Sequence, residues 1–326
     1  MTFPFNVYCL AMLVAAITAG ASLPLWRRWC LRTGLVDDPG HRKIHHTPIP
    51  LAGGMAVLGG VLLPLVLGAL VLWANSWGNS AGALLSYGYS RRATQLAAIA
   101  IGAIGMWLLG YFDDRIEFQP ARKFAGQLFI ALMVAAAGVR ITLFVHNIFF
   151  SYLVTVLWIL TVTNAFNFMD NMNGLCAGVG AIGAWYFGLV AASSGQYLVA
   201  LLAFLAFGAL LGFLPYNFPR ATAFLGDSGS HLVGYLLAVL AILPHFYTST
   251  HPRKFAVLDP LFVLAVPLLD LISVVTLRWK IGQPFYVGDT NHLSHRLVRR
   301  GLSATLAVIV IWAMAAILGA IALILK

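Results

Sequence analysis

The sequence of 326 residues is 61% hydrophobic and only 9% charged, whereas a soluble globular domain carries about 25% charged residues. This composition excludes a soluble protein and makes the lipid bilayer the solvent. The formal net charge of +10 comes from lysines and arginines scattered through short loops between apolar segments. The positive-inside rule accounts for these charges, so we expect no nucleic-acid partner.

Apolar runs of about 18 to 23 residues recur along the whole chain, each long enough to cross a hydrocarbon core of roughly 30 Å as a helix. We predict an all-α polytopic membrane protein with a single domain over residues 1–326. The ten predicted spans are residues 5–25, 51–73, 94–112, 124–139, 148–162, 174–192, 197–215, 230–246, 258–277 and 303–325. The fourth and fifth are short, and if they form one re-entrant hairpin the count changes while the sidedness of the loops does not.

Ten spans place both termini on one side of the membrane and five connecting loops on the other. These loops are residues 26–50, 113–123, 163–173, 216–229 and 278–302. They hold fourteen of the lysines and arginines against six on the opposite side, so we predict cytoplasmic loops, extracytoplasmic termini and a place in the cell inner membrane. Eight of the ten acidic residues fall in the same loops, which predicts an active site built from them.

Asp113 and Asp114 are adjacent at the cytoplasmic end of the third predicted span. Carboxylates at a membrane boundary are costly unless they are solvated, paired or bound to a metal, which favours a functional role. The alternative is a solvated helix end flanked by positive charge. We take the pair as catalytic candidates.

Asn164, Asn167 and Asp170 recur every three residues in the loop that ends at Asn173 and Gly174. On a helix this spacing places three oxygen-bearing side chains on one face. Such oxygens suit a hard cation such as Mg2+, and amides also pair with a nucleobase or a sugar amide. Helix capping is a sufficient explanation for Asp170 or Asn173 alone, but it does not require four amides and an acid.

Asp227 lies in a turn of small residues, between Gly226 and Gly229, where the eighth span opens. An acidic residue there is also a suitable cap for that helix. The flanking glycines, however, let a phosphate approach backbone N–H groups and the positive end of the helix. The turn therefore indicates an anion or metal site.

A loop between the last two spans contains His292, His295 and Arg296. Histidine beside arginine suits phosphate binding and proton transfer, although such a loop equally suits the headgroups of anionic lipids. In the span before it, Asp270 is an intramembrane carboxylate and hence a functional candidate by default. It is more simply explained as a brace between helices, through polar side chains one turn along.

Lys43 and His46 precede a glycine-rich helix start, and Lys123 and Gln127 lie at the start of the fourth span. Cations, glycines and a helix start together are typical of a site for a diphosphate. Positive-inside anchoring accounts for part of this charge.

In this order and between these spans, the five loops resemble those of the polyprenyl-phosphate N-acetylhexosamine-1-phosphate transferase family, which includes MraY, WecA and TagO. The resemblance covers nearly the whole chain. It implies ten helices, a cytoplasmic active site and Mg2+, with Mn2+ as an alternative. It also implies transfer of a sugar-1-phosphate from a UDP-sugar to a polyprenyl phosphate such as undecaprenyl phosphate, with release of UMP, as the first membrane step of a cell-envelope polysaccharide or glycan pathway.

Site residues follow from the same resemblance, motif by motif. It implies Asp227 as a ligand of the metal, with Asn167 as a second ligand. For Asp113 and Asp114 it implies either organisation of metal and phosphate or deprotonation of the lipid phosphate. The positions that it implies for substrate binding are Asn173 for the uracil, and Lys123 and His46 for phosphate.

Two positions at which this chain differs from the common motifs of the family indicate a branch within it. Where many bacterial members have Asp-Gly-x-Asp-Gly, this chain has Asp170-Asn171-Met172-Asn173-Gly174, and Asn at the second acidic position is also seen in eukaryotic relatives. Serine replaces a commoner histidine at position 294, and the three consecutive histidines of the MurNAc-pentapeptide enzyme are missing. The resemblance thus implies the WecA-like branch, with UDP-GlcNAc as the first donor and UDP-GalNAc or a modified diamino sugar as alternatives.

Two other function classes stay open at this stage. An ion-coupled transporter would use the acidic residues as an ion path, but such a path needs acids distributed through the membrane depth rather than clustered at one face. A catalytically inactive, lipid-binding relative is suggested by the amide that replaces the second acid. Besides the substrates and the bilayer, a homodimer is the partner that we consider.

Overall fold

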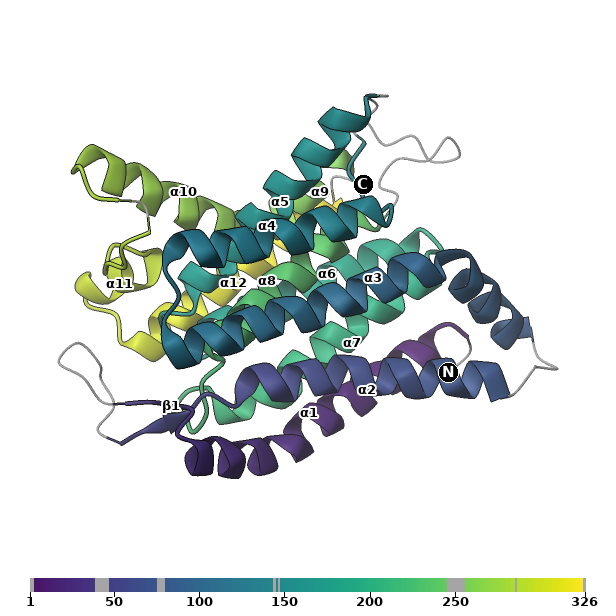
Figure 1. The fold of residues 1–326 in the computed structure, drawn as a ribbon, viewed down its shortest axis with the longest axis horizontal. Helices are drawn as coiled ribbons and strands as arrows, with labels where there is room; N and C mark the ends of the chain where they lie inside the picture. The colour runs from purple at the N-terminus through teal and green to yellow at the C-terminus, as the bar shows by residue number, and fades with distance from the viewer. Residues whose placement is uncertain are drawn as a thin grey trace.

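The computed structural model describes residues 3–38, 47–74, 80–142, 145, 147–244, 256–284 and 286–324. It is a bundle of helices that run roughly side by side (Figure 1). Within the described residues, seven helices are long and apolar enough to cross a membrane. They are α1 (Phe5–Thr33), α2 (Gly53–Ala74), α3 (Ser80–Ile116), α5 (Ile148–Met169), α6 (Leu175–Ser193), α7 (Tyr197–Phe213) and α12 (Ala304–Ile324). The prediction of an all-α polytopic membrane protein is confirmed.

Shorter helices complete the bundle. They are α4 (Pro120–Ala136), η1 (Leu214–Tyr216), α8 (Gly226–Ile242), η2 (Ala256–Leu258), α9 (Asp259–Val263), α10 (Ala265–Lys280) and α11 (Leu293–Arg299). Each predicted span overlaps a helix, but the ninth is divided between α9 and α10 at Leu264. The physical reason is Pro267, which has no N–H to donate to the carbonyl of Val263 and is tolerated only in the first turn of α10.

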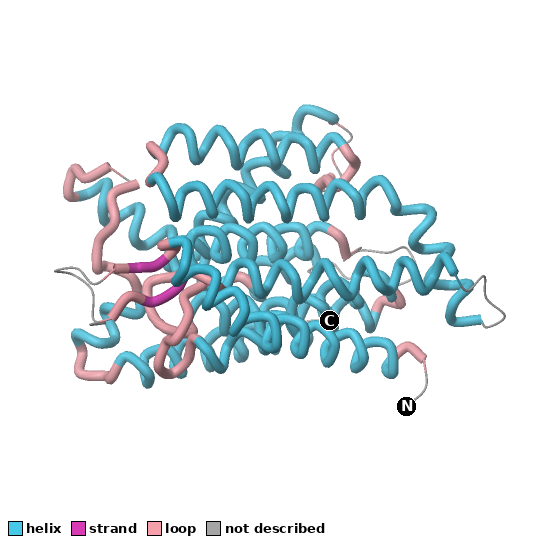
Figure 2. Tube along the Cα trace, turned by 60° about the horizontal axis from the view of Figure 1, so that its bottom comes forward, coloured by secondary structure: helices cyan, strands magenta, loops and turns pink. Residues whose placement is uncertain are grey.

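A two-stranded antiparallel hairpin, which the all-helical prediction did not include, joins α1 to α2. Strand β1 (Val36–Asp37) pairs with β2 (Ile49–Pro50), and both lie among the loops at one end of the bundle (Figure 2). Backbone hydrogen bonds connect this hairpin to the segment before α8: the N–H of Phe224 donates to Pro50 O at 2.9 Å. The start of α2 is thereby held against the start of α8.

Helix α8 lies at the centre of the bundle, buried over nearly its whole length and packed against α2, α3, α5 and α6. Its first turn passes between two glycines. A Cβ at Gly54 would lie 2.6 Å from the Ser228 hydroxyl oxygen, and a Cβ at Gly110 would overlap the backbone carbonyl of Asp227. Only hydrogen at these positions allows α2 and α3 to approach the turn so closely.

We expect Gly110→Ala to destabilise the protein by about 1–3 kcal/mol, because the added methyl group must displace the backbone at Asp227. Thermal unfolding in detergent measures this effect. Gly59→Ala in α2 is the matched control, since nothing lies within 4 Å of a Cβ there. Equal melting temperatures for the two variants would contradict the close approach of α3 to α8.

Candidate active site

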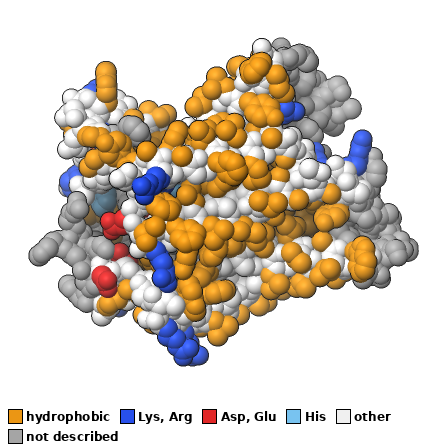
Figure 3. All heavy atoms as spheres, viewed as in Figure 1, with side chains coloured by type: hydrophobic (Ala, Val, Ile, Leu, Met, Phe, Trp, Pro, Cys, Tyr) orange, Lys and Arg blue, Asp and Glu red, His pale blue; other side chains and the backbone are white. Residues whose placement is uncertain are grey.

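One end of the bundle gathers the polar residues of four helices. The C-terminal ends of α3 and α5 meet the first turns of α4 and α8 there, and Figure 3 shows acidic side chains at this end of the visible face. These helices carry six of the predicted site residues: Asp113, Asp114, Lys123, Asn164, Asn167 and Asp227.

Lys123 is the centre of the cluster. Its Nζ lies 2.7 Å from Asp113 Oδ2 and 2.9 Å from Asp227 Oδ2, and it donates to Asn167 Oδ1 at 3.4 Å. Asp113 is itself fixed, because its Oδ1 accepts the N–H of Phe118 at 2.7 Å. One cation therefore bridges two carboxylates that come from different helices.

The carboxylate of Asp227 points into this cluster rather than capping its own helix. Its Oδ1 accepts a hydrogen bond of 2.6 Å from the amide of Asn167, which also donates to Ser230 Oγ at 2.9 Å. The side chain of Asp227 is 36% exposed, so a ligand can reach it. The alternative that Asp227 merely caps α8 does not describe this geometry.

Asp114 caps α8 instead, from the end of α3. Its two oxygens accept the N–H groups of Asp227 at 2.8 Å and of Ser228 at 3.0 Å. A carboxylate at a helix N-terminus satisfies unpaired donors and interacts favourably with the helix dipole. Gly226, with a φ of +71°, allows the chain to turn into the helix at this point.

Asn164 contacts Gln127 and the α5 backbone rather than the charged groups of the cluster. Its Nδ2 donates to Gln127 Oε1 at 2.8 Å and to Leu160 O at 2.8 Å. Gln127 is one helical turn beyond Lys123 and almost fully buried. The hydrogen bond between Asn164 and Gln127 thus holds α4 against α5. Because Lys123 is one turn away on α4, the same contact fixes its position.

Asp170 follows directly after the end of α5, and no hydrogen bond to its carboxylate is found among the described residues. Burial raises its pKa to about 8, and the negative charges of Asp227 and Asp114 add to the effect. A cation bound in the cluster would stabilise the ionised form of the Asp170 carboxyl group. Nearby, Asn173 Nδ2 donates to Pro219 O at 3.3 Å.

A second polar group forms where α10 meets α11. Asp270 accepts Leu293 N at 2.7 Å through Oδ1, and its Oδ2 lies 2.8 Å from His292 Nδ1. Asp270 therefore links α10 to the start of α11; it braces two segments as expected, but through His292 and Leu293 rather than through the polar side chains one turn along. Arg296 donates to Ser273 Oγ at 3.0 Å. These contacts order the loop that carries the predicted histidines.

The predicted histidines lie close to each other and to the end of α5. The His292 and His295 rings are 6.4 Å apart between centroids, and Ser294 Oγ donates to Asn171 Oδ1 at 2.6 Å. The pKa of His295 is lowered by burial, and next by His292 and Arg299. Both effects favour the neutral form of the His295 imidazole.

Arg278 is a buried residue that the sequence shows only as one of the fourteen cations in the predicted cytoplasmic loops. Its Nε is 3.0 Å from Asp289 Oδ2, and its guanidinium lies 5.0 Å from the centroid of the Phe168 ring. Burial opposes ionisation of Asp289, but hydrogen bonds from Arg278 and Asn291 hold its pKa at about 2. A pattern of hydrophobicity does not distinguish such an arginine from an anchoring one.

Lys43 and His46 lie outside the described residues, so their place in the site stays a prediction. Among the residues that the structure describes, no three His, Cys, Asp or Glu side chains converge as metal ligands. The donor set of the cluster is instead one exposed carboxylate with an adjoining amide. This set suits an ion that keeps much of its water, as Mg2+ does.

Comparison with known proteins places the chain among relatives. Residues 96–245 match the family model described as Glycosyl transferase family 4. The chain is 32% identical to the "Probable undecaprenyl-phosphate N-acetylglucosaminyl 1-phosphate transferase" of Bacillus subtilis over 97% of its own length and 84% of the relative's. The chain belongs to the polyprenyl-phosphate N-acetylhexosamine-1-phosphate transferase family.

Two further members of this family extend the comparison. The "Decaprenyl-phosphate N-acetylglucosaminephosphotransferase" of Mycobacterium tuberculosis is 32% identical, over 95% of this chain and 80% of the relative. The "Undecaprenyl-phosphate alpha-N-acetylglucosaminyl 1-phosphate transferase" of Escherichia coli K12 is 25% identical, over 90% of this chain and 77% of the relative. The family resemblance expected from the loops is thus confirmed over nearly the whole chain.

Proposed function

We propose that this transferase moves N-acetylglucosamine-1-phosphate from UDP-GlcNAc to undecaprenyl phosphate and releases UMP. The observation that carries the proposal is the cluster of Lys123, Asp113, Asp227 and Asn167 at one end of a membrane bundle, in a chain whose relatives are named for this transfer. In the overall reaction, which proceeds by direct attack or through an aspartyl intermediate, an oxygen of the lipid phosphate becomes bonded to the phosphorus that carries the sugar. The bond between that phosphorus and the bridging oxygen breaks, and the oxygen leaves with UMP.

The main physical difficulty of this reaction is to bring two phosphate anions together. A phosphate monoester has a second pKa of about 6, so the lipid phosphate is largely ionised near neutral pH. Lys123 supplies one positive charge beside Asp113 and Asp227, and Asp114 orients the start of α8 toward the same point. The ammonium group of Lys123 would screen the repulsion between the two phosphates, and the contacts of Asp114 fix the position of the α8 helix start.

We propose Mg2+ as the cofactor, held by Asp227 with Asn167 as a second ligand. Among the described residues, Lys123 forms ion pairs with Asp113 and Asp227, and no cation pairs with Asp114 or Asp170, so the cluster can accommodate further positive charge. Bound there, Mg2+ would neutralise charge on the diphosphate and on the departing UMP. Mn2+ prefers the same oxygen ligands.

The proposed topology has ten membrane crossings, with both termini outside and the cluster facing the cytoplasm of a cell with an inner membrane. The loops at the same end as the cluster hold fourteen lysines and arginines, whereas the opposite side holds six, which supports this orientation. A cytoplasmic site also gives direct access to a soluble UDP-sugar. The whole chain would form a single domain around α8.

The decisive experiment measures UMP release by the purified protein with undecaprenyl phosphate, Mg2+ and a panel of UDP-GlcNAc, UDP-GalNAc and a UDP-linked diamino sugar. We expect release with UDP-GlcNAc. Release with another donor alone would overturn the sugar assignment and keep the reaction class. If no donor in the panel gives UMP release, in a preparation shown to be folded by its melting curve, the proposed function is wrong.

Removal of the metal provides a separate prediction. We expect EDTA to abolish UMP release and added Mg2+ to restore it, because the phosphate charges then lack a divalent partner. Restoration by Mn2+ but not by Ca2+ is expected if the site demands small-ion octahedral geometry. Full activity in EDTA would contradict a metal at Asp227.

A further inference from the structure

Helix α11 carries His295 and Arg296 and lies at the same end of the bundle as strand β1 (Figure 1). On one side it is held to α10, where Asp270 accepts the N–H of Leu293 at 2.7 Å and Arg296 donates to Ser273 Oγ at 3.0 Å. Neither contact reaches the catalytic cluster. The position of α11 relative to the cluster therefore depends on the contacts of its other side.

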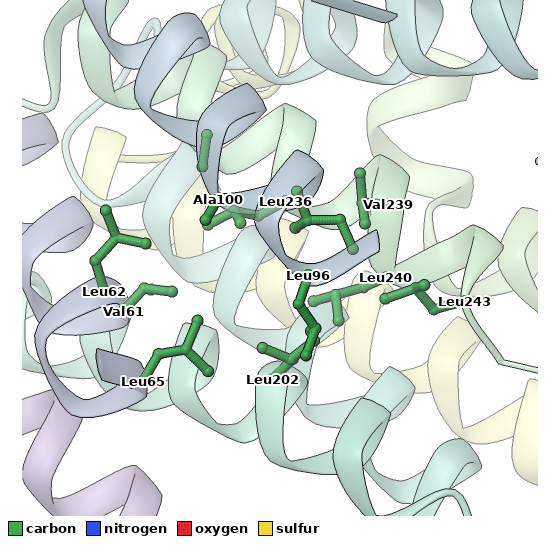
Figure 4. Close-up of a pocket in the computed structure, with 12 residues that line it drawn as sticks. Val61, Leu62, Leu65, Leu96, Ala100, Leu202, Leu236, Val239, Leu240 and Leu243 are labelled. Carbon is green, nitrogen blue, oxygen red and sulfur yellow. The ribbon is translucent and has the colours of Figure 1, made fainter. Parts of the chain in front are cut away.

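The interior of the bundle offers a sugar nucleotide no alternative. A cavity between α2, α3, α7 and α8 is lined by apolar side chains alone, among them Leu96, Leu202 and Leu240 (Figure 4). A UDP-sugar needs hydrogen-bonding partners, which this cavity does not provide. Helix α11 does provide them, beside the cluster.

Ser294 makes the contact on the other side of α11. Its hydroxyl donates to Asn171 Oδ1 at 2.6 Å, and the residue is only 1% exposed. Within the described part of the chain, this is the only hydrogen bond between α11 and the segment 170–174 that joins α5 to α6. Water does not readily replace a bond shielded in this way, so loss of Ser294 leaves the acceptor of Asn171 without its donor.

Capping of α11 does not explain this serine. Serine in the first turn of a helix commonly accepts a backbone N–H of that helix. The N-cap of α11 is His292, however, and the hydroxyl of Ser294 donates to another segment of the chain. The contact thus joins two elements rather than completing one.

Asn171 is itself fixed on the end of α5. Its Nδ2 donates to Phe168 O at 2.8 Å, which sets the amide with Oδ1 toward Ser294. The Phe168 ring has its centroid 5.0 Å from the guanidinium carbon of Arg278 and 6.1 Å from the centroid of the His292 ring. The end of α5 is therefore the surface on which α11 and the loop before it are placed.

The Ser294 contact lies next to the catalytic cluster along the chain. Asn171 directly follows Asp170, whose carboxyl group interacts electrostatically with Asp227. A displacement of α11 from Asn171 is thus a displacement from the cluster.

The two residues that follow Ser294 keep hydrogen-bonding capacity for a ligand. No hydrogen bond to the His295 ring is found among the described residues, and Arg296 Nε is buried without a partner. Both side chains project from one helix of 7 residues. The position of Ser294 therefore also determines where these two side chains lie.

We propose that the hydrogen bond between Ser294 and Asn171 is a positioning contact that places His295 and Arg296 beside the cluster, so that both bind one UDP-sugar. This inference rests on the proposed function, because it concerns the donor of that reaction. Ser294 and Asn171 act through α11 rather than on the substrate. When the contact is lost, α11 populates other positions, and the apparent affinity for the donor falls with the fraction that is correctly placed.

The test measures KM for the UDP-sugar that the protein accepts, and kcat for UMP release, in Ser294→Ala. We expect KM to rise about fivefold, the effect of one net hydrogen bond, and kcat to stay within about twofold. Ser151→Ala is the matched control, since Ser151 is 4% exposed and donates to Ile141 O at 2.8 Å near the other end of α5. The control should lose similar thermal stability and keep the wild-type KM. An unchanged KM in Ser294→Ala would overturn the proposal.

A double-variant cycle shows whether the two residues act together. Asn171→Ala also removes the bond to Phe168 O, so we expect it to raise KM at least as much as Ser294→Ala. Asn171→Ala/Ser294→Ala should raise KM no further than Asn171→Ala alone, because both changes remove the same contact. Effects on KM that multiply would show independent roles and refute a shared positioning contact.

Hydrogen–deuterium exchange of α11 gives a readout that needs no turnover. We expect faster exchange over Leu293–Arg299 in Ser294→Ala than in the wild type or in Ser151→Ala. Equal exchange in the three proteins would overturn the positioning contact whether or not UMP is released. A wild-type protein that releases no UMP contradicts the proposed function instead, so the two failures are distinguishable.

Discussion

We expect Asp227→Asn to lower the rate of UMP release by about 10³-fold, the largest effect of any single substitution in the cluster. The carboxylate of Asp227 contacts both Lys123 and Asn167 and is the acidic group of the pair proposed to hold Mg2+. Asparagine keeps the size of the side chain and the backbone contacts with Asp114, so the helix start should remain in place. The measurement is kcat for UMP release at saturating Mg2+, with the melting temperature recorded for both proteins.

Glu117→Gln is the matched control for this substitution. Glu117 is an exposed acid directly after α3, close in sequence to Asp113, and its side chain forms no hydrogen bond or ion pair within the described part of the chain. The same chemical change there should leave the rate within about twofold, because an exposed carboxylate without a partner contributes little. A rate for Asp227→Asn within tenfold of the wild type would contradict the role proposed for Asp227.

The second large effect is expected for Lys123→Met, which should lower the rate of UMP release by about 10²- to 10³-fold. Without the ammonium group, Asp113 and Asp227 face each other unpaired, and the phosphates lose a fixed positive charge. The same change makes the cluster more negative. We therefore expect the variant to bind Mg2+ more tightly than the wild type while it reacts more slowly.

This opposite change in affinity and rate separates an electrostatic role of Lys123 from a loss of folding, which would weaken both. Magnesium titrations of UMP release, together with calorimetric titration of the purified protein, measure the two quantities. Lys123→Arg keeps the charge and should recover part of the rate, although the guanidinium group has a different shape. Weaker Mg2+ binding in Lys123→Met would refute the proposed arrangement.

The family and the candidate loops could be predicted without coordinates because their signals are local. Asp113 and Asp114 follow an apolar run, and Asn164, Asn167 and Asp170 recur at helical spacing in a short segment. Such patterns do not show which groups form pairs. Lys123 and Asp227 are 104 residues apart, and their contact depends on how α4 and α8 are rotated in the bundle.

The roles of individual carboxylates also depended on packing. Asp227 was an equally good cap in the sequence, and only the approach of α3 to the start of α8 shows that Asp114 provides the cap. Arg278 was only one of the cations counted in the predicted cytoplasmic loops, yet it is buried against Asp289 and Phe168. Charge and hydropathy along a chain describe the medium that a residue prefers, and they do not describe its partner.

The sequence by itself determined that this protein is a helical membrane protein of its transferase family, with its polar chemistry concentrated in a few loops. The physical reason is that the bilayer requires apolar segments of fixed length, and excludes unpaired charge from them, so composition alone separates spans from loops. Only the tertiary structure decided the break at Leu264, the hairpin beside α2 and the ion pairs of Lys123. These features depend on close contacts between helices distant in sequence, which side-chain shape and glycine positions determine.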